Sequence, residues 1–122
     1  EAQKIVVCEG FVDMLSMIEI AKAKGKIKDY IFCSLNSVSN LSKFVEYAQN
    51  RPNLKVISIL DGDQAGETTT YKLLKALPHA KDIRANFGIS EKGYKDLNES
   101  LKAQLQRHQE QEEKQQRKGR KI

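Results

Sequence analysis

The sequence predicts an α/β domain with a central, mostly parallel four-stranded sheet and helices on both faces. Two observations lead to this prediction. Short apolar or β-branched runs alternate with segments of helical periodicity four times along the chain, and this order is typical of parallel sheets with helical crossovers. The first run, residues 4–8, is continuously apolar after its lysine rather than alternating, which indicates a strand that is covered on both faces.

The first half of the chain supplies two strands and two helices. Residues 11–24 are expected to form a helix that ends at Gly25, because apolar side chains recur there at helical spacing. A second strand is expected at residues 30–33, and a second helix follows it and closes at residues 50–52. The inward positions are predicted to be Met14, Leu15, Ile18 and Ala21 in the first helix, and Leu41, Phe44, Val45 and Ala48 in the second.

The second half repeats the pattern around a third strand at residues 54–60. A helix is expected over residues 65–77, where Pro78 ends it and Leu73, Leu74 and Leu77 form the inner face. A weaker fourth strand is predicted at residues 82–87. After a loop at residues 88–93, a last helix is expected to open within residues 94–99.

Charge and composition divide the chain into one domain, residues 1–101, and a polar, basic tail rich in Gln and Lys, residues 102–122. The net charge of +5 comes mainly from the tail, which holds seven Lys or Arg against three Glu, whereas residues 1–101 hold 14 basic and 13 acidic groups. Excess charge therefore gives no argument for nucleic-acid binding by the domain itself. The tail is expected to be a solvated helix or disordered, with contact between residues 114–121 and a phosphate backbone as the alternative.

Cysteine usage and hydropathy indicate a cytoplasmic protein without a membrane segment. Cys8 and Cys33 lie in apolar runs without a CxxC motif or a nearby histidine, so both are expected to be buried, reduced thiols. No apolar run approaches the ~20 residues that a membrane-spanning helix needs. The chain begins at a strand without Met, and we therefore expect it to be a fragment of a longer protein.

Acidic side chains follow three of the predicted strands. Asp61-Gly62-Asp63 comes directly after the third strand, Glu9 with Asp13 follows the first, and Asp96 with Glu99 follows the fourth. The carboxyl ends of parallel strands meet at one edge of a sheet, so we expect these groups to converge. Converging carboxylates repel one another unless a cation lies between them, and Mg²⁺ prefers such oxygen ligands. Taken alone, Asp63 or Asp96 would more often be a helix N-cap than a metal ligand, so the prediction depends on all three segments together.

Two other protein families also have closely spaced acids, but this sequence lacks residues that each of them requires. A calcium-binding EF-hand loop that began at Asp61 would need an oxygen ligand at Ala65 and a glutamate at Lys72. A phosphatase with an aspartyl-phosphate intermediate would usually have Thr or Val at Ala65, and its nucleophile normally follows the first strand. Nucleophilic catalysis has no support from the two histidines, because neither His79 nor His108 has an evident Ser or Cys partner.

Three motifs together resemble the TOPRIM domain in its bacterial primase-like form. They are Glu9-Gly10-Phe11-Val12-Asp13 after the first strand, Asp61-Gly62-Asp63-Gln64-Ala65-Gly66 after the third, and Lys95-Asp96-Leu97-Asn98-Glu99 after the fourth. The resemblance covers about residues 4–101. It implies a Rossmann-like sheet and phosphoryl transfer on nucleic acid that depends on Mg²⁺ or Mn²⁺.

The resemblance also implies roles for individual residues. Glu9, Asp61 and Asp63 match the catalytic and metal-binding acids, and Lys95 matches a phosphate or nucleic-acid contact. The accessory polar positions are Asp13, Asp96 and Asn98. Many primases have Asp in place of Asn98 and Pro in place of Leu97, and the turn at residues 34–38 lacks the glycine that primases often carry there. Asn98 and Leu97 leave open whether the site holds one ion or two, and the missing glycine leaves open whether a nucleotide can approach the turn at residues 34–38.

The function that the resemblance implies is a nucleotidyl-transfer module of a larger DNA replication or mobilisation protein, of the kind that plasmids and transposons also encode. Expected partners are DNA, RNA or nucleotides and the other domains of the parent protein, with no membrane partner. As a fragment the chain should be weakly active or inactive. The alternatives are strand cleavage of the nuclease or topoisomerase kind, and a module without catalysis that binds metal or nucleic acid.

Overall fold

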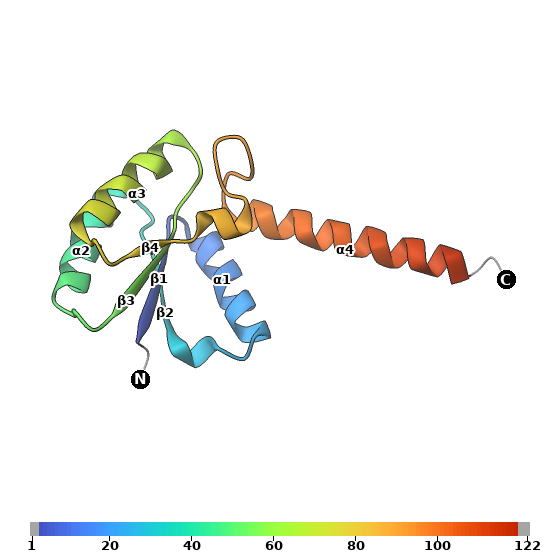
Figure 1. Cartoon of the computed structure of the whole chain (residues 1–122), viewed down its shortest axis with the longest axis horizontal. Helices are drawn as coiled ribbons and strands as arrows, with labels where there is room; N and C mark the ends of the chain where they lie inside the picture. The colour runs from blue at the N-terminus through green and yellow to red at the C-terminus, as the bar shows by residue number, and fades with distance from the viewer. Residues whose placement is uncertain (1–2, 120–122) are drawn as a thin grey trace.

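The computed structural model describes residues 3–119, which form a four-stranded sheet with helices on both faces (Figure 1). All strand pairs are parallel, and the strand order is β2-β1-β3-β4. The strands are β1 (Lys4–Cys8), β2 (Tyr30–Ser34), β3 (Lys55–Ile59) and β4 (Lys81–Asp82). The helices are α1 (Phe11–Ala23), α2 (Leu41–Gln49), α3 (Gln64–Ala76) and α4 (Leu97–Gly119), with short 3-10 turns η1 (Ile27–Asp29), η2 (Val38–Asn40) and η3 (Arg84–Phe87). The predicted fold class is therefore confirmed.

Alternate residues of the central strands point into two separate cores. Ile5, Val7 and Val56 pack with α2 and α3 on one face of the sheet. Val6 and Ile59 pack with α1, η3 and the first turns of α4 on the other face. Burial on both faces explains why β1 is continuously apolar after Lys4 and why β3 is apolar between Val56 and Ile59 except at the buried Ser58.

The predicted inner faces of α2 and α3 are confirmed, whereas that of α1 is partly wrong. In α1 the buried positions are Asp13, Met17 and Ala21, while Leu15 is 45% exposed. Apolar residues occur on several sides of this helix, so periodicity alone did not identify the side that faces the sheet. The consequence for the site is that Asp13 points inward, toward the start of α4.

The predicted fourth strand at residues 82–87 is wrong beyond its first residue. Strand β4 ends at Asp82, and residues 84–87 form the turn η3. The Asp82 carboxylate accepts a hydrogen bond from the backbone N–H of Arg84 at 3.1 Å, which turns the chain away from the sheet. This turn brings the Arg84 side chain into the interior of the domain.

Helix α4 extends from the body of the domain as a polar helix (Figure 1). It continues through the segment for which both a helix and disorder were expected, up to residue 119, and Arg120, Lys121 and Ile122 lie outside the described residues. The division of the chain at residue 101 stays a prediction. Among the described residues, no helix combines the length and the apolar character that crossing a bilayer requires.

Both cysteines are free thiols, as expected, but the predicted burial is confirmed only for Cys8. Cys8 is fully buried, and Cys33 is partly buried in the edge strand β2. Burial raises the pKa of the Cys8 thiol to about 12, with smaller contributions from neighbouring acids. Cys8 is therefore a neutral core residue, although it directly precedes Glu9.

Candidate metal centre

The carboxyl ends of β1 and β3 bring three of the predicted acids together. These strands are neighbours with Cys8 opposite Ile59, so Glu9 and Asp61 emerge at the same edge of the sheet. One carboxylate oxygen from each of Glu9, Asp61 and Asp63 lies within 4.8 Å of the other two. The Glu9 Oε2 atom also accepts a hydrogen bond from the backbone N–H of Asp61 at 3.1 Å, which holds the two strand ends in place.

A second group of acids shares Asp61 with the first. Carboxylate oxygens of Asp13, Asp61 and Asp96 also lie within 4.8 Å of one another. Asp13 comes from α1 and is 7% exposed, and its Oδ1 accepts a hydrogen bond from the backbone N–H of Asn98 at 3.1 Å. We call the five residues of the two groups, Glu9, Asp13, Asp61, Asp63 and Asp96, the acid cluster.

Two members of the acid cluster are also helix caps. Asp63 accepts a hydrogen bond from the backbone N–H of Gly66 at 2.8 Å and begins α3. Asp96 accepts one from the backbone N–H of Glu99 at 2.8 Å at the start of α4. Each cap uses one carboxylate oxygen, Oδ1. The capping role orients both side chains and is compatible with a metal-binding role, because a carboxylate has several acceptor positions.

Asp61 has the electrostatic environment that a bound cation would relieve. Its Oδ1 atom is buried and accepts no hydrogen bond from the described residues. The pKa of Asp61 is raised to about 8, mainly by burial and then by the neighbouring carboxylates of Glu9, Asp13 and Asp96 in that order. The pKa of Asp13 is also raised, mainly by burial. A buried carboxylate oxygen without a donor, among carboxylates of like charge, fits a hard divalent cation.

These pKa shifts predict that the metal-free protein loses stability as the pH rises. The pKa of Asp61 is about 8 in the folded protein, above the ordinary value of 3.8 that applies when unfolded, so folding favours the protonated form. The contribution of protonated Asp61 to the free energy of unfolding is fully present below about pH 4, and it is lost as the pH rises to about 8. We expect a loss of about 1–2 kcal/mol, discounted because the residue is partly exposed.

Thermal melting in EDTA at several pH values checks this expectation. The Asp61→Asn variant should melt higher than the wild type at the alkaline end, and the two should converge in acid. Asp29→Asn, which removes an exposed carboxylate far from the acid cluster, is the matched control. If Asp61→Asn and Asp29→Asn keep the same pH profile, the repulsion at Asp61 does not affect folding.

Two glycines of the motif are required by close backbone contacts. A Cβ atom on Gly66 would lie 2.0 Å from the carbonyl oxygen of Asp61, and one on Gly62 would lie 2.6 Å from the backbone nitrogen of Ser90. Gly62 also donates its N–H to the carbonyl oxygen of Lys95 at 2.6 Å. The loop that carries Asp61 therefore packs directly against α3 and against the segment that precedes α4.

Arg84 supports the Asp61 loop and was not identified by the sequence. It is 8% exposed and forms ion pairs with Glu67 at 2.7 Å and Asp82 at 2.8 Å. Its Nη1 also donates to the carbonyl oxygen of Asp61 at 3.2 Å. Asp82 is the main group that raises the pKa of Arg84, although burial opposes the rise. The sequence places Arg84 within the predicted fourth strand, and no local signal marks its side chain as buried.

The remaining predicted positions lie near the acid cluster. The Lys95 side chain is exposed, while its backbone binds Gly62 and Glu99. Asn98 is partly buried, and its backbone contact with Asp13 is described above. In the turn that lacks glycine, Asn36 adopts a left-handed φ of 61° and donates its N–H to the Glu9 carbonyl at 2.9 Å. Asn tolerates this conformation, so the turn forms without glycine.

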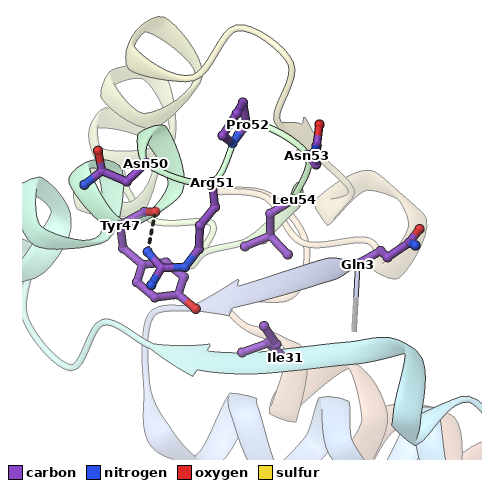
Figure 2. A pocket seen from close by; sticks show the side chains of 8 residues that line it. All are labelled: Gln3, Ile31, Tyr47, Asn50, Arg51, Pro52, Asn53 and Leu54. Carbon is purple, nitrogen blue, oxygen red and sulfur yellow. Dashed lines mark hydrogen bonds between the residues drawn. The ribbon is translucent and has the colours of Figure 1, made fainter. Parts of the chain in front are cut away.

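The opposite edge of the sheet contains a hollow of about 770 Å³ that takes no part in the acid cluster (Figure 2). Arg51 lies over the ring of Tyr47 at 3.7 Å and donates to its carbonyl oxygen at 3.1 Å. None of the lining residues is acidic. A carboxylate metal site is therefore confined to the carboxyl edge among the described residues.

Comparisons with known proteins point to one family. The family model described as Toprim-like matches residues 6–101. The primase fragment of the bacteriophage T7 primase-helicase protein is 27% identical with a TM-score of 0.62; the match covers 87% of this chain and 41% of that fragment. The small TOPRIM domain protein from Bacillus stearothermophilus is 16% identical with a TM-score of 0.53, over 81% and 78% of the two chains, and supports the fold alone.

A third solved structure contains T7 primase domains as well. It is the complex of bacteriophage T7 lagging-strand DNA polymerase with primase domains bound to an RNA/DNA hybrid and dTTP. The identity is 28% and the TM-score 0.50, over 66% of this chain and 40% of that one. No curated protein matches the sequence. The chain thus spans less than half the length of the T7 primase chains that it matches.

Proposed function

Because this chain belongs to the Toprim-like family, we propose that the acid cluster is the Mg²⁺ or Mn²⁺ site of a nucleotidyl-transfer module. The module would act on DNA or RNA within a larger replication or mobilisation protein. The observation that carries this proposal is the position of Asp61, which belongs to both groups of carboxylates and has a buried oxygen without a donor.

Each residue of the acid cluster has a distinct part in the proposal. Glu9, Asp61 and Asp63 would hold one ion, and Asp13 and Asp96 would complete a second group around the shared Asp61. A bound divalent ion would neutralise phosphate charge and orient the reacting oxygens. Glu9 is oriented by its hydrogen bond from the Asp61 backbone, which suits a role as metal ligand or as general acid and base. Lys95, exposed beside the cluster, would contact phosphate.

Relatives favour polymerisation over strand cleavage as the reaction. The T7 relatives are primase domains, and one of them is bound to an RNA/DNA hybrid and dTTP. Strand cleavage would use the same acids, so the site geometry alone does not choose between the two reactions. Because the chain spans 41% of the T7 primase fragment, the activity of the whole protein would depend on other domains as well.

Metal titration of the purified chain tests the site without requiring activity. We expect Mg²⁺ and Mn²⁺ to bind the wild type, and the Asp61→Asn, Asp63→Asn double variant to show no binding, measured by calorimetry or by the Mn²⁺ spin-resonance signal. The Glu46→Gln, Glu110→Gln variant removes the same charge from exposed positions on α2 and α4 and should bind like the wild type. Equal affinity in the wild type and the aspartate double variant would exclude the acid cluster as the metal site.

A further inference from the structure

Charge is segregated between the two edges of the sheet. The acid cluster occupies the carboxyl edge, whereas Lys4, Lys55 and Lys81 lie on β1, β3 and β4 near the amino edge. The nearly neutral total for residues 1–101 conceals this separation. A strand rises ~3.3 Å per residue, so the length of β1 separates the two edges by about 17 Å.

The three lysines project from the same face of the sheet. Lys4 lies directly opposite Lys55, and Lys81 lies opposite Ile57, two residues further along β3. Because side chains alternate along a strand, Lys55 and Ile57 share a face, and so do Lys4 and Lys81. With His79 they line a hollow of about 350 Å³ whose other lining residues are Val56 and Ile57. We call Lys4, Lys55, Lys81 and His79 the lysine patch.

No carboxylate within the described part of the chain pairs with the lysine patch, although the Lys4 ammonium lies 5.6 Å from the centre of the Tyr30 ring. None of the three lysines forms an ion pair there, and the hollow has no acidic lining residue. Like charges directly opposite each other on neighbouring strands destabilise a sheet. The pair Lys4 and Lys55 therefore has an energetic cost that an anionic ligand would remove.

Two structural explanations of surface lysines do not account for the patch. Lys22 and Lys75 stand in the last turns of α1 and α3, where they complement the helix dipole. The patch lysines stand on strands instead. Lysine on an edge strand discourages aggregation, which would explain Lys81 on β4. Lys4 is paired on both sides, with Tyr30 on β2 and Lys55 on β3, so no edge needs protection there, and β4 begins only opposite Ile57.

We propose that the lysine patch binds the phosphate backbone of a single-stranded nucleic acid. Neighbouring strands lie ~4.8 Å apart, so two ammonium groups on flexible stems can reach one phosphate group. The choice of nucleic acid over an acidic protein segment rests on the proposed function, because the acid cluster lies about one strand length from the patch. The patch would hold the strand at a distance from the reacting centre, without a metal ion and without base selectivity.

Binding of a fluorescein-labelled oligothymidylate to the whole chain in EDTA tests this proposal. EDTA removes any contribution of bound metal, so a failure of the acid cluster does not affect the result. The Lys4→Gln, Lys55→Gln, Lys81→Gln variant should bind at least ~10-fold more weakly at about 0.1 M salt, and its slope of log affinity against log salt should be smaller by about 2. The Asp61→Asn, Asp63→Asn variant should retain binding.

The matched control is Lys43→Gln, Lys72→Gln, Lys102→Gln, which removes the same charge from exposed positions on α2, α3 and α4. It should bind within about threefold of the wild type, because long-range attraction is screened beyond ~10 Å. Equal losses in the two triple variants would overturn the proposal. So would stronger binding of a labelled poly-glutamate peptide than of the oligonucleotide. If the triple variant does not fold, Lys81→Gln alone can replace it, because Lys81 lies on the exposed edge strand. This single variant should show a smaller loss of oligonucleotide affinity.

Discussion

Replacing Arg84 by methionine is expected to destabilise the domain by about 3 kcal/mol, the lower end of the range for breaking a buried ion pair. The variant leaves Asp82 and Glu67 without their cation and removes the donor to the Asp61 carbonyl. The lower end applies because the Glu67 side chain is 50% exposed and water can solvate it. Metal affinity should fall as well, since the Asp61 loop loses a support.

Urea unfolding of Arg84→Met and Arg51→Met provides the comparison. Arg51 is an exposed arginine stacked on Tyr47, and its replacement should cost less than about 1 kcal/mol. Double-mutant cycles that combine Arg84→Met with Glu67→Gln or with Asp82→Asn measure the interaction free energy between Arg84 and each carboxylate. Equal unfolding midpoints for the two arginine variants would mean that the Arg84 network contributes nothing to folding.

Replacing Gly66 by alanine is the second change with a large expected effect. The new Cβ would lie 2.0 Å from the Asp61 carbonyl oxygen and 2.6 Å from its carbonyl carbon. Both are backbone atoms, so either α3 or the Asp61 loop must move. We expect a loss of about 3 kcal/mol, at the upper end for overpacking, and a melting temperature lower by on the order of 10–20 °C.

Gly10→Ala is the matched control, because Gly10 belongs to the other acidic motif and its Cβ would meet only the Asp13 carboxylate at 3.4 Å. That variant should fold and bind metal like the wild type. Gly66→Ala should bind Mn²⁺ more weakly even at a temperature where circular dichroism indicates that it is folded. A Gly66→Ala protein with unchanged metal affinity would mean that the Asp61 loop tolerates displacement without consequence for the site.

The sequence predicted the parts of the fold that depend on local pattern. The limits of β1 were predicted to the residue, because its apolar run ends at Glu9-Gly10 and both faces are buried. The inner face of α3 was predicted from Leu73, which is fully buried. The fourth strand was wrong because the side chain of Asp82 captures the backbone N–H of Arg84. A side chain that competes with the neighbouring strand for a backbone N–H does not change the alternation of apolar residues, so the sequence pattern cannot reveal it.

Of the candidate site, the sequence predicted the acidic residues but not the residues that support them. The acids were found because parallel strands end at one edge, and the structure places five of the six predicted acids in two groups that share Asp61, whereas Glu99 belongs to neither group. The sequence did not indicate that Arg84 lies beneath this edge. Nor did it indicate that Lys4 and Lys55 stand side by side, since their alignment follows from the pairing of segments about fifty residues apart.

By itself, the sequence determined the order of strands and helices along the chain and the positions of acids at strand ends, because local propensity and hydrophobic period control both. Only the tertiary structure decided the strand order β2-β1-β3-β4, and with it the contact of Glu9 with the Asp61 backbone. It also decided the inward course of Arg84 and the alignment of the lysine patch. These features depend on register and packing between distant segments, which are set by the burial of both sheet faces together.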